Sequence, residues 1–335
     1  MGRPIIQISL KDFETRKHEI ASELWRAATE IGFFYLKDHG LTDAEMQHML
    51  SLSEQFFNLP AEQKANFKFD LKKNIGWESG QQKRASAKVP ELKESLQLKW
   101  HDMEGRWPTN DDVPDFESYS KNFMQKCQNI SFQVLSCFAI GLGFEEDFFT
   151  RNHDVTKPDA QQTFRLMHYF SVEGKEFPAD FPRAGAHCDF ETITLLFAKG
   201  AGLEVCPGRE AVSEHAIRPN EWTPCPAIPG AITVNIGDAL MRWSDDRLKS
   251  NYHRVRMPRP GEYQGSRYSI AYFNQANKSA IIQGPEKHYP PVTAQDFVKE
   301  SLAAIYLSQE GQQGDNAGII KAAKHPENAV LNAVD

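Results

Sequence analysis

The texture of the chain changes at Gln162, and this change limits the folds that it can adopt. Beyond this point, short β-branched or aromatic runs alternate with glycine and proline. The runs read TFRLMHYF, ETITLLFA, GLEVCP, AITVNIGDAL, HRVRMP and RYSIAYFN. Many short strands at fairly regular spacing are typical of a β-sandwich or a β-barrel. We therefore expect a barrel of about eight strands, the number found in a jelly roll.

The first third of the chain predicts helices around one short strand. From Asp12 to about Phe69 the pattern is helical, interrupted by the breaker Gly32 and a buried strand at residues 33–36. The run at residues 42–45, Thr-Asp-Ala-Glu, is a capping box and predicts the start of a second helix. This region should pack on the barrel as a helical layer.

The remaining segments complete a fold that is mainly β with helical additions. Residues 72–99 are rich in lysine and glycine, which predicts a loop and a short strand. Residues 116–142 return to helical spacing, and so do residues 294–307. We divide the chain into a helix-rich N-terminal region (1–110), a core of one helix plus the barrel (111–307) and a loosely held tail (308–335).

The composition indicates a small-molecule partner. Lys plus Arg number 38 against 45 for Asp plus Glu, and a net charge of −7 argues against binding to nucleic acid. No run approaches the ~20 apolar residues of a membrane helix, and the N-terminus does not resemble a signal peptide. The five cysteines share no C-x-x-C spacing, so we expect reduced thiols in a cytoplasmic protein. We expect a monomer or a weak homodimer that does not bind membranes.

One short motif suggests a metal site. His187 and Asp189 stand two apart, so in an extended backbone both side chains project from one face. His253 opens another strand of the same β-region and is a third potential ligand. Two imidazoles and one carboxylate occupy one face of an octahedron, the arrangement of non-haem Fe(II) oxygenases. Taken alone, this motif is weak evidence, since the alternative is an ion pair at a strand end for His187 and Asp189 and a core imidazole bonded to the backbone for His253.

A second motif follows His253 by fourteen residues. Arg267 and Ser269 share one face of an alternating strand. A guanidinium fork beside a hydroxyl makes a receptor for a carboxylate inside a barrel. Because an unpaired arginine in so apolar a strand is costly, the alternative is an internal bridge to an acidic side chain.

Two longer stretches carry a family resemblance. Residues 32–40 read GFFYLKDHG and resemble the "GFF…HG" signature of the isopenicillin N synthase-like group of 2-oxoglutarate/Fe(II)-dependent dioxygenases. A second stretch runs from GDAL at residues 237–240 through HRV at residues 253–255 to Pro258. It resembles the segment of the same group that leads to the distal metal histidine. The resemblance covers roughly residues 4–307 and implies a double-stranded β-helix, which is the jelly-roll barrel expected above.

The resemblance also implies roles for the two short motifs. His187, Asp189 and His253 match the iron ligands of the family. Arg267 and Ser269 match the pair that holds the distal carboxylate of 2-oxoglutarate.

The sequence departs from the family at one position. Tyr169 matches the tyrosine of an Asn-x-Tyr motif and is expected to help bind 2-oxoglutarate, but Met167 replaces the asparagine. We expect Met167 to line the substrate pocket instead. Further substrate contacts are expected near the mouth of the barrel, where the alternative for an aromatic residue is core packing and for a lysine a solvated charge. These candidates are Trp77, Phe190, Trp243, Phe273, Gln275 and Lys99.

By resemblance, the chain is an oxygenase that uses Fe(II), O2 and 2-oxoglutarate, with ascorbate as a candidate reductant. Such an enzyme hydroxylates, desaturates or cyclises a small organic molecule, often in specialised metabolism, while 2-oxoglutarate is converted to succinate and CO2. One alternative is an iron-dependent oxidase of the isopenicillin N synthase or aminocyclopropane carboxylate oxidase kind, in which Arg267 and Ser269 hold the substrate's own carboxylate. Another is a barrel-shaped binding or sensor protein without turnover.

Overall fold

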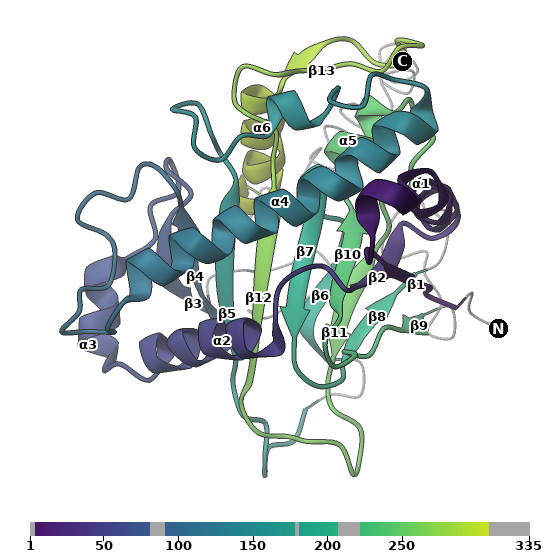
Figure 1. The fold of residues 1–335 in the computed structure, drawn as a ribbon. Helices are drawn as coiled ribbons and strands as arrows, with labels where there is room; N and C mark the ends of the chain where they lie inside the picture. The colour runs from purple at the N-terminus through teal and green to yellow at the C-terminus, as the bar shows by residue number, and fades with distance from the viewer. Residues whose placement is uncertain (1–3, 81–90, 178–180, 207–221, 308–335) are drawn as a thin grey trace, which may run out of the picture.

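Two β-sheets form the centre of the protein (Figure 1). The structure is a computed structural model, and it describes residues 4–80, 91–177, 181–206 and 222–307. The larger sheet has eight strands in the order β1-β2-β10-β7-β12-β5-β4-β3. They are β1 (Gln7–Ser9), β2 (Phe33–Lys37), β10 (Ile232–Ile236), β7 (Ile193–Ala198), β12 (Arg267–Asn274), β5 (Thr163–Tyr169), β4 (Lys93–Lys99) and β3 (Gly76–Ser79). Only β1 and β2 pair in parallel within this sheet.

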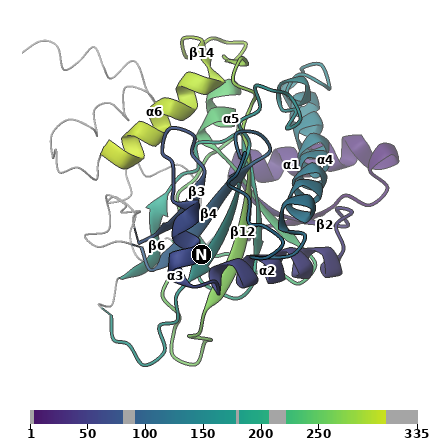
Figure 2. The ribbon, with the colours of Figure 1, turned by 90° about the vertical axis from the view of Figure 1, so that its left-hand side faces the viewer.

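The smaller sheet has four strands and lies on one face of the larger sheet. Its strands, in spatial order, are β6 (Pro182–His187), β11 (His253–Arg256), β8 (Leu203–Val205) and β9 (Thr223–Pro224). A separate hairpin pairs β13 (Ile281–Ile282) with β14 (Val292–Thr293). Figure 2 shows β6 on one side of β12 and the long helices on the other, so the larger sheet is the middle layer.

Three long helices cover the opposite face of the larger sheet (Figures 1 and 2). They are α1 (Phe13–Glu30), α2 (Asp43–Phe57) and α4 (Phe116–Leu142). Shorter elements are α3 (Ala61–Lys64), η1 (Ala65–Phe67), η2 (Thr150–Asn152) and α5 (Asp238–Trp243), and α6 (Ala294–Leu307) lies on the side of the smaller sheet.

Strand alternation divides the side chains of the larger sheet between two environments. Side chains such as Phe34, Leu96, Phe164 and Ile270 point to the helices and belong to the main hydrophobic core. Their neighbours along each strand therefore point the other way, toward the smaller sheet. The functional residues of the larger sheet are consequently found on this inner face.

Most of the predicted elements are present. The strand at residues 33–36 and the helices at residues 116–142 and 294–307 are confirmed. The capping box is also confirmed, since the Thr42 hydroxyl accepts from the Glu45 amide and the Glu45 carboxylate accepts from the Thr42 amide. Residues 76–99 contain two strands rather than one. The predicted division into three regions stays a prediction, and its tail at 308–335 lies outside the described residues.

The run AITVNIGDAL, predicted to be one of the strand-forming runs, contains a strand and the start of a helix. β10 ends at Ile236, and α5 begins at Asp238. The turn is set by contacts with another segment: the Gly237 amide donates to the Thr192 carbonyl, and a Cβ on Gly237 would lie 2.0 Å from the Glu191 carbonyl oxygen. Tertiary packing decides this boundary.

The helices were also compared with what a membrane-spanning helix needs. Among the described residues, no helix combines the length and the apolar character needed to cross a bilayer.

A buried histidine makes the core sensitive to acid. The His153 side chain is fully buried, with Nδ1 2.6 Å from the Phe149 carbonyl oxygen and Nε2 2.8 Å from the Thr192 hydroxyl. Since a carbonyl only accepts, Nδ1–H donates to Phe149. In the neutral ring, which burial favours, Nε2 accepts from the Thr192 hydroxyl. Burial lowers the pKa of His153 to about 4.

We predict that His153 destabilises the folded state as the pH falls. Its pKa is near 6.5 in the unfolded chain and about 4 in the folded one, so between these values the unfolded state binds more protons. Lowering the pH from 7 to 5 should therefore cost about 2 kcal/mol through this residue alone. Urea unfolding of the wild type and His153→Gln at both pH values measures the difference, and an equal loss in both proteins would contradict the prediction.

Candidate active site

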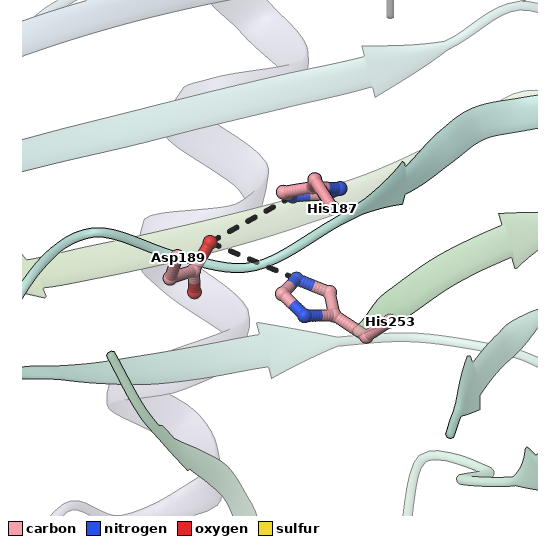
Figure 3. Close-up of side chains that lie close together, drawn as sticks. All are labelled: His187, Asp189 and His253. Carbon is pink, nitrogen blue, oxygen red and sulfur yellow. Dashed lines mark ion pairs between the residues drawn. The ribbon is translucent and has the colours of Figure 1, made fainter. Parts of the chain in front are cut away.

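Three side chains converge between the two sheets (Figure 3). Asp189 Oδ1 lies 3.7 Å from His187 Nε2 and 3.7 Å from His253 Nε2. One potential ligand atom from each residue lies within 4.8 Å of the other two. The two histidines come from neighbouring strands, because His253 of β11 is the direct partner of His187 of β6.

Both imidazoles are oriented by the backbone. His187 Nδ1 lies 2.9 Å from the Gly185 carbonyl oxygen, and His253 Nδ1 lies 3.4 Å from the Asn251 carbonyl oxygen. A carbonyl partner fixes the proton on Nδ1 and leaves the lone pair of Nε2 for a metal ion. Both Nε2 atoms are the ones that face Asp189.

Asp189 lies two residues beyond the end of β6, which ends at His187. Its carboxylate is held by side chains of the larger sheet. Oδ2 accepts hydrogen bonds from Thr194 Oγ1 at 2.6 Å and from Asn235 Nδ2 at 2.8 Å. Oδ1 is thereby left to point at the two imidazoles.

Arg267 and Ser269 lie on the inner face of β12, as predicted. The buried Arg267 donates through Nε to the Lys199 carbonyl at 2.9 Å, and its guanidinium lies 4.9 Å from the ring centre of Tyr169. Arg267 Nη1 and Ser269 Oγ are both buried and have no hydrogen-bond partner among the residues that the structure describes. Among the described acidic residues none pairs with Arg267, so the internal bridge is not formed there. Two such orphaned donors on one face fit a bound carboxylate.

Arg183 is a neighbour of Arg267 that the sequence analysis missed. Its Nη2 donates to the carbonyl oxygens of Phe170 at 3.1 Å and Gly265 at 3.2 Å, and so ties down the loop that precedes Arg267. Burial, and then the charge of Arg267, lower the pKa of Arg183. Both guanidiniums line a second hollow with Tyr263 and Tyr268. No local sequence signal distinguished Arg183 from an ordinary surface arginine.

A cavity opens directly beside the three converging side chains. Met167, Phe190 and Phe273, three of the predicted substrate contacts, line it together with His187, Asp189 and His253. Tyr169 also lines it, and its hydroxyl lies 3.9 Å from Met167 Sδ. Helix α6 contributes Leu302. The walls are therefore largely apolar, which favours exclusion of water.

Two tryptophans that were predicted to contact the substrate, Trp243 and Trp77, do not line this cavity. Trp243 lies on α5 and is buried against Phe149, with ring centres 5.4 Å apart, and against His153. Trp77 pairs with Leu96 and lies on the helix-covered face of the larger sheet, where its indole nitrogen donates to Glu94 at 2.7 Å. Strand alternation puts this face on the far side from the cavity.

Gln275 and Lys99 also lie outside the cavity lining. Gln275 follows the end of β12 and is buried, and its side-chain atoms have no hydrogen-bond partner within the described part of the chain. Lys99 is on the inner face of β4, where burial, together with the charge of Lys278, lowers its pKa to about 8. Neither residue contacts the space beside the histidines.

Three charged residues of the cavity wall were missed. They are Lys93, Arg165 and Glu191. Arg165 had a usable signal, since it shares the parity of Met167 and Tyr169 along one strand. Burial, and then Asp189, raise the pKa of Glu191.

The site as a whole defines a class of protein. Two imidazoles and one carboxylate, all oriented by hydrogen bonds and open on the side of a cavity, are typical of mononuclear non-haem iron enzymes. The unpartnered donors of Arg267 and Ser269 lie on the same inner face.

Comparisons with known proteins agree with this class. Residues 4–123 match the N-terminal domain of the non-haem dioxygenases in morphine synthesis, and residues 161–276 match the 2OG-Fe(II) oxygenase superfamily. The proline hydroxylase buaE of Petromyces alliaceus is 30% identical over 89% of this chain and 97% of its own length. The 2-oxoglutarate-dependent dioxygenase frbA of a Dothideomycetidae species is 28% identical over 89% and 95%.

A solved structure shares the fold. The crystal structure of a Neurospora crassa protein with alpha-KG and thymine has a TM-score of 0.76 and 28% identity, covering 90% of this chain and 97% of that one. The chain belongs to the isopenicillin N synthase-like family of 2-oxoglutarate/Fe(II) oxygenases, which are enzymes with Fe(II) and 2-oxoglutarate as the family's cofactors.

We predict that the hydrogen bonds to Asp189 Oδ2 support metal binding. Asn235→Ala and Thr194→Val each remove one donor, which frees the carboxylate to rotate away from the imidazoles. Each change should weaken Fe(II) or Mn(II) binding by about 10–100-fold under anaerobic conditions, as measured by calorimetry. Thr233→Ala, on the same face of β10 as Asn235, is the matched control, and an equal loss in the control would count against the idea.

Proposed function

We propose that the protein hydroxylates, or desaturates or cyclises, a small organic molecule in specialised metabolism, coupled to decarboxylation of 2-oxoglutarate to succinate and CO2. His187, Asp189 and His253 would hold Fe(II), which activates O2 when 2-oxoglutarate is bound. The observation that carries the proposal is the convergence of their three ligand atoms beside an open cavity.

Arg267 and Ser269 would hold the distal carboxylate of 2-oxoglutarate. Their partnerless donors are the supporting observation, and the ring of Tyr169 closes one side of the guanidinium. A charge-assisted hydrogen bond in a dry site is stronger than a neutral one. The alternative of an oxidase that does without 2-oxoglutarate has less support, because the Neurospora relative holds alpha-KG. A sensor without turnover has less support still, because the family consists of enzymes.

The two opposed sheets would form the jelly-roll barrel of a double-stranded β-helix. Residues 111–307 would then be its core and residues 1–110 its helical cover, as the sequence predicts. The relatives act on or bind small molecules named as proline and thymine, which supports a small-molecule substrate here. The monomeric or weakly dimeric state and the cytoplasmic location stay predictions.

We predict that either His187→Ala or Asp189→Ala abolishes 2-oxoglutarate turnover. Each variant keeps only two of the three ligands, so Fe(II) is no longer held in the facial arrangement. Succinate formation measures turnover, and circular dichroism checks that the fold persists. A variant with full activity would overturn the assignment of the metal site.

We predict that Arg267→Leu weakens 2-oxoglutarate binding. Loss of a charged hydrogen-bond partner in a dry site costs about 2–5 kcal/mol, which corresponds to tens to thousands in affinity. Calorimetry with the Fe(II)-loaded protein gives the Kd directly, without turnover. Arg151→Leu, at an arginine with 47% of its side chain exposed, is the matched control. An unchanged Kd in Arg267→Leu would favour the oxidase alternative.

A further inference from the structure

We propose that Arg165 binds a carboxylate of the substrate, so that the natural substrates are small organic acids with an apolar body. The inference rests on the proposed function, since it assigns the second organic molecule at the same site. It depends on where Arg165 lies, on its unused hydrogen-bonding groups and on the charges around it.

Arg165 lies at the metal end of the inner face. It is paired with Ala271 on one side and with Gln97 on the other, and it lines the cavity with His187 and Asp189. Arg267 is paired with Tyr169, four residues further along β5. At about 3.3 Å per residue the two arginines are separated by roughly 13 Å along the strand, so they serve different ligands.

The guanidinium of Arg165 is held in place with one edge unused. Nε donates to Gln97 Oε1 at 2.5 Å, and the group lies 5.1 Å from the ring centre of Phe273. Gln97 is buried and Phe273 is part of the cavity wall. Neither Nη atom of Arg165 has a hydrogen-bond partner among the described residues. A fork that is fixed in advance loses little freedom when it binds a carboxylate with two parallel hydrogen bonds.

The charges of the cavity wall favour an anion at this point. The Lys93 ammonium is neutralised by Glu91 at 2.7 Å, and both side chains are buried. Asp189 and Glu191 also line the cavity, and the charge of Arg165 acts on Glu191, but neither carboxylate comes within ion-pair distance of Arg165 in the described structure. The partly buried guanidinium of Arg165 therefore keeps its Nη edge for the carboxylate of a ligand.

The apolar side chains of the cavity wall indicate what kind of body the ligand has. Phe33, Phe190 and Leu302 line the cavity with Phe273. These side chains offer area for apolar packing and few polar groups. An acid with an aliphatic or aromatic body satisfies both the arginine and this lining.

Matched acids and amides test the inference. The protein is loaded anaerobically with Fe(II) and saturating 2-oxoglutarate, which keeps added acids away from Arg267. Calorimetry then measures benzoate, phenylacetate and cyclohexanecarboxylate against their primary amides. We expect at least one acid to bind about tenfold or more tightly than its amide, and Arg165→Gln to remove this preference. Arg165→Lys keeps the charge but not the two-pronged guanidinium, so this variant should retain only part of the preference for the acid.

The controls separate this inference from the proposed function. Arg151→Gln, an equivalent change at an exposed site, should leave every ligand affinity unchanged. The Kd for 2-oxoglutarate is measured first, and a wild-type protein that does not bind 2-oxoglutarate contradicts the proposed function. If 2-oxoglutarate binds but no acid is preferred over its amide, or if Arg165→Gln keeps the preference, the role of Arg165 is wrong.

Discussion

The pairing of β11 with β6 is the constraint on which the site depends. His253 lies directly opposite His187, so backbone hydrogen bonds between strands set the separation of the two imidazoles, with ring centres 4.2 Å apart. The third group, Asp189, lies beyond the strand and is held by Thr194 of β7 and Asn235 of β10. The smaller sheet thus supplies two ligand atoms while the larger sheet orients the third. A shift of one sheet against the other would separate the carboxylate from the histidines.

Strand alternation explains why some of the site could be predicted from the sequence. The faces of Arg267 and Ser269 follow from their spacing within one strand, because each is a local property of β12. The positions of Trp77 and Trp243 do not follow in this way. Trp77 belongs to a strand whose inner and outer faces are fixed only by pairing with β4, and Trp243 belongs to a helix whose start depends on packing against Glu191. Such contacts join segments remote in the chain and leave no local pattern.

The position of Arg165 could be predicted from the sequence only in part. Its parity with Met167 and Tyr169 was visible in the sequence, but parity alone does not say what an arginine meets. Its two fixing contacts come from Gln97 and Phe273, on the neighbouring strands β4 and β12. The strand order β12-β5-β4 puts Gln97 directly opposite Arg165 and puts Phe273 two residues along β12 from the position opposite Arg165, on the same face. The sequence therefore predicts the face of β5 on which Arg165 lies, and the order of the strands decides which side chains it contacts.

The role of Met167 can be inferred from its position between the two arginines. In the proposed complex, 2-oxoglutarate occupies the Arg267 end of the inner face and the substrate acid occupies the Arg165 end. Met167 lies between them with Leu196 and Ala271, in a small apolar cluster. An asparagine at this position would add a donor that either acid could use, whereas a thioether has none. The apolar cluster would therefore keep the two proposed carboxylates on their own arginines, and the methionine that departs from the family pattern fits the proposed binding of two different acids at once.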